Sequence, residues 1–292
     1  WFDGACGEGA NGKRQEYDWE KILHTIDVLQ PNAVTAIMGD DIRWVGNERG
    51  LGRATEWSVT PFTPMSYSHS HAANLELGIS ETAKDLGSRE IIARAKHLYW
   101  YPSEVDVSIR PGWFYHEWQD DQVRSLANLV DIYFNSVGCN SVLLLNIPPD
   151  RRGLIHEIDA ERVKELANYI AQMYAENYLT STKEQWQGEQ VESHEFEVQK
   201  GAIVNTLLLA EDITKGQHIE GFKVEALIND KWHYLTSGTT IGYKRLLRFS
   251  DCTPTKIRIT ILSTRATAHI SDVGLYYAAP LHDSVYTPTI SD

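Results

Sequence analysis

The sequence predicts an α/β domain followed by an all-β domain. Over residues 1–180, short apolar runs alternate with segments whose apolar residues recur at helical spacing. Strands that alternate with helices in this way predict a parallel sheet. From about residue 180 the helical period disappears, and short runs separated by turns predict an antiparallel β-sandwich over residues 181–292. The boundary is expected in the Ser/Thr/Gln-rich stretch near residues 180–190.

The elements expected in the first part can be placed by their caps and breakers. A helix is expected to begin at Asp18 and end before Pro31, and a last helix is expected to begin near Asp159. A helix between these two is expected to be capped by Asp120 or Asp121 and to end at Gly138. The buried strands are expected over residues 33–39, 104–109 and 141–147, and residues 50–87 are expected to form a long loop or lid.

The composition favours a protein that acts on a neutral ligand. Lys and Arg number 27 against 40 Asp and Glu, so the formal net charge of −13 opposes binding to nucleic acid or to an anionic membrane surface. No apolar run approaches the roughly 20 residues of a membrane helix. The nine Trp and fourteen Tyr residues suit stacking on sugar rings, although most aromatic residues fill cores. The three cysteines are far apart in the sequence and are expected to be free thiols.

The first residues of the chain carry a candidate carboxylate. Trp1 and Phe2 lead into Asp3, and glycines follow at positions 4, 7, 9 and 12. A strand that delivers an aspartate to the mouth of a barrel has this form, because glycine allows a ligand to approach the backbone. The same residues would also suit an aspartate that caps an ordinary turn. Because the chain begins within the expected strand, we expect an N-terminal part to precede it.

Further carboxylates follow the other expected strands. Glu48 lies after the second strand and Glu104 lies at a terminus of another, while Glu56 in the long loop is a weaker candidate. Two carboxylates that converge on one pocket are the minimum requirement for glycoside hydrolysis, although any one of them alone is more often a solvated surface acid. His69 and His71 could share a face if they lay on a strand, but no third zinc ligand of matching spacing is present, so no metal site is predicted.

Several motifs in this order carry a resemblance to a known family. The motifs are Trp1-Phe2-Asp3-Gly4-Ala5, Asp41-Ile42-Arg43-Trp44-Val45-Gly46-Asn47-Glu48, Ser108-Ile109-Arg110-Pro111-Gly112-Trp113-Phe114-Tyr115-His116 and Asn146-Ile147-Pro148-Pro149-Asp150. The first resembles the nucleophile motif of the α-L-fucosidases of glycoside hydrolase family 29. The second resembles the acid/base segment of the subfamily that prefers α-1,3/1,4-linked fucose. The resemblance extends over essentially the whole chain.

The resemblance implies a fold and a set of site residues. Residues 1–180 would be the second half of a (β/α)8-like barrel, and a companion segment or chain would supply the first half. Asp3 would be the nucleophile and Glu48 the general acid/base, with Glu104 as the alternative acid/base. Arg110 would support the pocket, and the tryptophans that would line the fucose pocket are Trp1, Trp44, Trp57 and Trp113.

The same resemblance implies a retaining exo-α-L-fucosidase that removes fucose from branched glycans by double displacement, without a cofactor or a metal. It also implies a bacterial enzyme that is periplasmic or secreted. Two other readings remain open from the residues. The chain could be a non-catalytic glycan-binding protein, or a different retaining glycosidase on the same barrel. A binding protein has no need of a paired acid and nucleophile, which favours the enzyme.

Overall fold

The computed structural model describes residues 1–2, 12–13, 16–37, 39–64, 67–80, 82–180, 186–188 and 192–282. The chain divides into two compact units. The first comprises Trp1–Gly46 and Trp57–Glu104, and the second comprises Asn47–Glu56 and Val105–Asp292. Neither unit begins or ends at the domain boundary expected near residue 180. The helices before residue 180 pack in the same unit as the strands after it.

The first unit begins with the expected helix but lacks the expected strand after it. Helix α1 (Trp19–Leu29) is capped by Asp18, whose carboxylate accepts the Lys21 amide at 3.1 Å. In the described part of residues 33–39 no regular strand forms, so the predicted strand is wrong there; Ala36 makes a bridge to Ile42, and its carbonyl accepts from the Phe2 amide at 3.2 Å. The cause is local, because Asp41 takes the amide and hydroxyl of Thr35 at 2.7 and 2.8 Å. Ile37 then turns the backbone at φ +75°.

Short strands complete the first unit. β1 (Arg43–Trp44) runs parallel to the start of β4 (Ser103–Ser108), and β2 (Val59–Thr60) runs antiparallel to β3 (Tyr99–Trp100). Two helices, α2 (Tyr67–Leu77) and α3 (Arg89–Arg94), lie between β2 and β3 in the sequence. The expected loop over 50–87 therefore contains β2 and α2, which the sequence pattern did not predict. A small core of Phe62, Ile79, Leu86 and Tyr101 packs this segment.

The first part of the second unit contains the elements predicted with the strongest patterns. Helix α4 (Leu126–Asn135), strand β5 (Val142–Asn146) and helix α5 (Glu157–Met173) follow the 3-10 helix η1 (Glu117–Gln122). Strands form where they were expected over 104–109 and 141–147, and all six residues of β4 are buried, but the expected burial of the second strand is wrong for this chain because no residue of β5 is buried. The expected Asp120 or Asp121 cap is wrong, because the Ser125 hydroxyl caps α4 by accepting the Asn128 amide at 3.2 Å.

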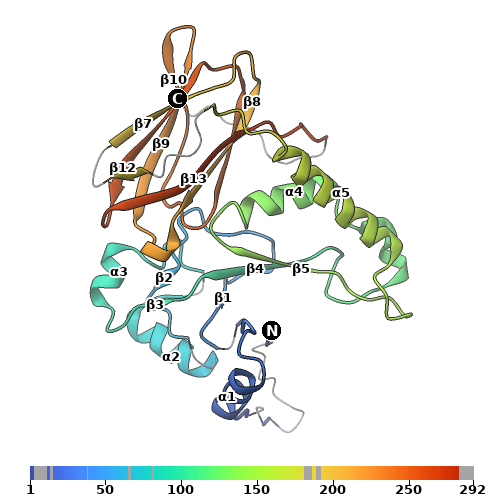
Figure 1. The fold of residues 1–292 in the computed structure, drawn as a ribbon. Coiled ribbons are helices and arrows are strands. Elements are labelled where there is room, and N and C mark those ends of the chain that lie inside the picture. The colour runs from blue at the N-terminus through green and yellow to red at the C-terminus, as the bar shows by residue number, and fades with distance from the viewer. Residues whose placement is uncertain are drawn as a thin grey trace. The chain divides into compact units, whose positions relative to one another are not determined.

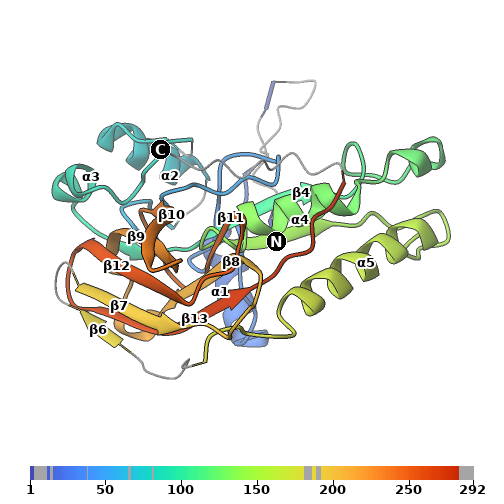
Figure 2. The same cartoon turned by 90° about the horizontal axis from the view of Figure 1, so that it is seen from above.

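The rest of the second unit consists of two four-stranded antiparallel sheets, drawn in yellow to red in Figures 1 and 2. One sheet has the strand order β10-β9-β12-β7 and the other has the order β11-β8-β13-β6. Apolar residues from both sheets form one cluster, so the sheets pack face to face. The strands are β6 (Trp186–Gly188), β7 (Glu192–Glu197), β8 (Val204–Glu211), β9 (Ile219–Ile228), β10 (Lys231–Gly238), β11 (Arg245–Cys252), β12 (Lys256–Thr264) and β13 (Ala268–Tyr276). All except β6 overlap the short runs predicted as strands in the sequence, at residues 194–198, 203–209, 218–227, 232–236, 241–249, 256–261 and 269–277.

Helices α4 and α5 lie side by side in both views and share a core with these sheets (Figures 1 and 2). Asp131 of α4 accepts a hydrogen bond from Arg248 of β11 at 2.6 Å, and the Tyr243 amide donates to the Asn140 side chain at 2.9 Å. Cys139 and Cys252 are free thiols, as expected. Within the described ranges, no helix combines the length and apolar character needed to cross a bilayer.

Candidate functional site

The first unit brings a buried carboxylate against the start of the chain. Glu104 lies on β4, where all six residues are buried, and it is 3% exposed. The indole Nε1 of Trp1 donates to Glu104 Oε1 at 2.7 Å, while the Trp1 side chain remains half exposed. Asp3, the expected nucleophile, follows Trp1 by two positions and lies outside the described residues. Glu104 is therefore held beside the segment that leads into Asp3.

Trp44 joins the same group through the pairing of two parallel strands. Trp44 of β1 is the register partner of Glu104 on β4, so the two side chains leave the same face of the sheet. The next residue, Val45, donates its amide to the Glu104 carbonyl at 2.9 Å, which fixes the register. Three of the residues predicted from the sequence, Trp1, Trp44 and Glu104, thus gather in one unit.

Trp57 does not line an open pocket in the described residues, and its expected role in sugar binding stays a prediction. The residue is 2% exposed, and its ring packs directly against Gly87. A sugar could stack on this ring only if the residues that now cover it moved away. Glu56 is structural as well. Its carboxylate is buried and pairs with Arg53 at 3.1 Å, and its carbonyl accepts from the Gln217 side chain at 2.8 Å.

Glu48, the expected acid/base, lies at the tip of a loop in the second unit. The amide of Arg49 donates to the Asn47 side chain at 3.1 Å, and the same side chain donates to the Leu51 carbonyl at 2.8 Å. These bonds form a tight turn that presents Glu48 to solvent. Its carboxylate has no hydrogen bond or ion pair within the part of the chain that the structure describes, so it remains available for proton transfer.

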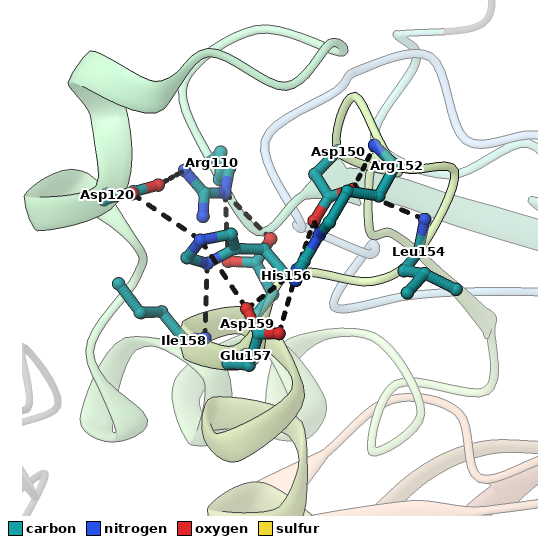
Figure 3. Close-up of polar contacts among 9 residues, drawn as sticks. All are labelled: Arg110, Asp120, Asp150, Arg152, Leu154, His156, Glu157, Ile158 and Asp159. Carbon is teal, nitrogen blue, oxygen red and sulfur yellow. Dashed lines mark hydrogen bonds and ion pairs between the residues drawn. The ribbon is translucent and has the colours of Figure 1, made fainter.

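Arg110 lies at the centre of a buried ionic cluster (Figure 3). Its Nε donates to both oxygens of Asp159 at 2.8 and 2.9 Å, and the side chains of both residues are fully buried. Its Nη1 donates to Asp120 at 2.8 Å, and its guanidinium lies 4.8 Å from the ring centre of Tyr115. Burial lowers the pKa of Arg110, but hydrogen bonds to Asp159 and Asp120 outweigh it, so the pKa is raised. Arg110 is therefore a permanent cation that supports the loop after β4.

The cluster extends to the start of α5 (Figure 3). His156 caps this helix, stacks on the Tyr115 ring at a centroid distance of 5.5 Å and lies 3.8 Å from the Asp120 carboxylate. Beside it, Arg152 binds Asp150 at 2.6 Å and Glu157 at 2.9 Å. The hydrogen bonds from Arg152 lower the pKa of Asp150. The turn before α5 is thus stabilised by the contacts of Arg152 with Asp150 and Glu157 and by the contact of His156 with Asp120.

The loop between β4 and η1 carries Trp113 and several exposed aromatic residues. The Trp113 side chain is half-buried, and its carbonyl accepts from the Asn146 side chain at 3.2 Å. Gly112 makes the turn before it at φ +71°, a conformation that favours glycine. Phe114 and Trp118 are 77% and 68% exposed. Trp118 was not predicted as a site residue, although four of the five residues from 114 to 118 have an aromatic or imidazole side chain.

Ser68, His69, Ser70 and His71 lie on a helix, α2, and not on a strand. The shared face considered for His69 and His71 required a strand, and the backbone at these positions is helical. Across the described ranges, no three His, Cys, Asp or Glu side chains cluster in a way that could hold a metal ion.

The buried Glu104 carboxylate accepts a hydrogen bond from the Trp1 indole, and Trp44 is paired with Glu104 on the neighbouring strand. A carboxylate with two indoles is a composition that suits a carbohydrate-binding site. The comparisons with known proteins specify the family. The alpha-L-fucosidase family model matches residues 1–176, and the chain belongs to this family. It is 32% identical over 308 residues to alpha-L-fucosidase 1 of Arabidopsis thaliana, covering 94% of this chain and 57% of that protein.

Solved structures give the same result. A candidate alpha-L-fucosidase from Bacteroides ovatus is 53% identical, with a TM-score of 0.93, and the match covers 100% of this chain and 50% of that one. A glycoside hydrolase 29 fucosidase of Ruminococcus gnavus, solved in complex with fucose, is 25% identical with a TM-score of 0.75, covering 94% of this chain and 59% of that one. The chain therefore spans about half the length of the relatives it matches.

Proposed function

We propose that this chain forms part of an α-L-fucosidase that hydrolyses terminal fucose with retention of configuration. The observation that carries the proposal is the hydrogen bond from the Trp1 indole to Glu104, together with the pairing of Trp44 with Glu104, because a carboxylate with two indoles suits a sugar pocket. The family membership supports the same activity. Indoles would supply the apolar surface that the C6 methyl group of fucose requires.

The proposed reaction is a double displacement. The Asp3 carboxylate attacks C1 of the fucosyl group, and the bond between C1 and the glycosidic oxygen breaks as Glu48 donates a proton to that oxygen. A covalent fucosyl ester on Asp3 results. Glu48 then accepts a proton from a water molecule as the water oxygen attacks C1, the ester bond between C1 and Asp3 breaks, and fucose leaves with its original configuration. Each carboxylate ends the cycle in its starting state.

We assign the acid/base role to Glu48 and a positioning role to Glu104. Glu48 is exposed and unbonded in the described part of the chain, so it can exchange protons with a substrate and with water. Glu104 is buried and holds the Trp1 indole at 2.7 Å, which suits a group that orients the pocket. Glu104 remains the alternative acid/base, and the experiment below separates the two.

We further propose that residues 1–180 form the later half of a (β/α)8 barrel and that another segment supplies the remaining strands. The parallel pairing of β1 with β4 supports this arrangement. The apolar strand β5 supports it as well, since Val142 and Leu144 are 39% and 36% exposed, whereas strands of parallel sheets are normally covered on both faces. The two antiparallel sheets would form a β-sandwich that braces the barrel.

Azide rescue tests the assignment in the full-length protein. The substrate is an aryl α-L-fucoside with a good leaving group, tested on the parent, Asp3→Gly, Glu48→Ala and Glu104→Gln. If Asp3 is the nucleophile, azide takes its place in Asp3→Gly and gives the β-fucosyl azide. If Glu48 is the acid/base, azide attacks the covalent intermediate in Glu48→Ala and gives the α-fucosyl azide. Rescue of Glu104→Gln in place of Glu48→Ala would transfer the acid/base role to Glu104.

Linkage preference is tested with two natural substrates. We propose specificity for α-1,3/1,4-linked fucose, so a Lewis-type trisaccharide should be cleaved and 2′-fucosyllactose should not. Comparable release from both would refute the specificity while leaving the fucosidase activity intact. If the parent releases no fucose from any substrate, the proposed activity itself is wrong.

A further inference from the structure

An open pocket of about 480 Å³ lies in the second unit and has no role in the reaction described above. It is lined by Tyr115, His116, Glu117, Trp118 and Arg151. The rings of His116 and Trp118 are nearly parallel, with an interplanar angle of 25° and centroids 5.6 Å apart. Trp118 is 68% exposed, so a large flat apolar surface faces solvent at this pocket. Exposed aromatic surface of this kind commonly marks a binding site.

The same pocket contains two charged side chains that have no partner in the described part of the chain. Neither Glu117 nor Arg151 forms a hydrogen bond or an ion pair through its side chain there. The neighbouring Arg152, by contrast, is bound to Asp150 and Glu157. The pocket thus combines an open ring face with one acceptor group and one donor group, both free to bind a ligand.

The support beneath the pocket is rigid. Arg110, fully buried, binds Asp120 of η1 and lies against the Tyr115 ring. The Gln119 side chain donates to the Pro111 carbonyl at 3.0 Å and its amide donates to the His116 carbonyl at 3.0 Å. These contacts hold the loop in one conformation, so a ligand would bind without the entropy cost of ordering the loop.

We propose that this pocket binds a neutral pyranose of the glycan that carries the fucose, which makes it a subsite for the part of the substrate that is not released. A pyranose presents a flat C–H face for the Trp118 ring and neighbouring hydroxyls for Glu117 and Arg151. The presence of both charges in one pocket favours a neutral sugar over an anionic one, because Glu117 would repel a carboxylate or sulfate that Arg151 attracts. The substrate aspect of this proposal rests on the proposed function.

Kinetics on two substrates test the subsite. Trp118→Ala should lower kcat/KM for a fucosylated oligosaccharide by roughly tenfold, since removal of a central aromatic anchor has effects of this size. The same variant should change kcat/KM for an aryl fucoside, which has no further sugar, by less than about twofold. Phe114→Ala is the matched control, because Phe114 is 77% exposed in the same loop but does not line the pocket. Phe114→Ala should leave both substrates unchanged.

Two results would overturn the subsite. Equal losses on both substrates would mean that Trp118 supports the fucose site or the loop, and no loss on the oligosaccharide would mean that the pocket binds no part of the substrate. Arg151→Gln should follow Trp118→Ala in direction, with the aryl fucoside again unaffected.

Direct binding separates this proposal from the proposed catalytic function. Saturation-transfer NMR with the unfucosylated disaccharide galactosyl-β-1,3-N-acetylglucosamine should show binding to the parent and to Phe114→Ala, and loss of the signal in Trp118→Ala. Such a result would support the sugar pocket even if the parent released no fucose. A signal that persists in Trp118→Ala, or no signal with the parent, would refute the pocket while the fucosidase assay decides the activity independently.

Discussion

Replacement of Arg110 by methionine should strongly destabilise the protein. The Arg110 and Asp159 side chains are both fully buried and share two hydrogen bonds of 2.8 and 2.9 Å. Removal of the cation would leave the Asp159 charge buried without a partner, which costs about 3–5 kcal/mol. The bond to Asp120, whose side chain is 27% exposed, adds less than about 1 kcal/mol. Because Asp159 also lies in the first turn of α5, where the helix dipole favours an anion, we expect the lower half of this range.

The assay is urea unfolding of the full-length protein, followed by far-UV circular dichroism. Lys164→Met is the control on the same helix, since its pair with Glu161 is about 70% exposed on both sides and should contribute less than about 1 kcal/mol. The double variant Arg110→Met with Asp159→Leu removes both charges and should recover most of the loss, to within about 1 kcal/mol of the parent. The reasoning is refuted if Arg110→Met costs no more than Lys164→Met, or if the double variant is as unstable as Arg110→Met.

Two further predictions concern packing and pH. Gly87→Ala should lower the free energy of unfolding by about 1–3 kcal/mol, because the new Cβ would lie 2.5 Å from the Trp57 side chain. Gly221→Ala should cost less, because the nearest atom to its new Cβ is Ser263 Oγ at 3.1 Å. The melting temperatures of the two variants test this order. Burial raises the pKa of Glu211 despite three backbone amides that favour its charged form. The folded state therefore binds this proton more tightly, so stability should fall as pH rises from about 4.5 through the folded pKa, and an unfolding series over pH with Glu211→Gln should remove that slope.

The sequence predicted the elements in which one periodic signal dominates. α5 and β5 have apolar residues at helical spacing or in a continuous run, and both formed close to the expected bounds. Seven of the eight strands of the two antiparallel sheets were also predicted, because each is a short run between turn residues. The strand predicted over 33–39 did not form in the described residues, where the Asp41 side chain takes the Thr35 amide that a strand would use.

The sequence alone also determined the family, because each family motif is a contiguous stretch of residues and the motifs occur in the expected order. The tertiary structure decided which of those residues gather. In the tertiary structure Glu104 accepts a hydrogen bond from the half-exposed Trp1, whereas Trp57 is buried against Gly87. Both tryptophans had been predicted from the sequence to line the sugar pocket. The tertiary structure also pairs Arg110 with Asp159, which stabilises the loop that exposes Trp118. Exposure and pairing depend on contacts between residues far apart in the chain, such as Arg110 with Asp159, and no local pattern encodes those contacts.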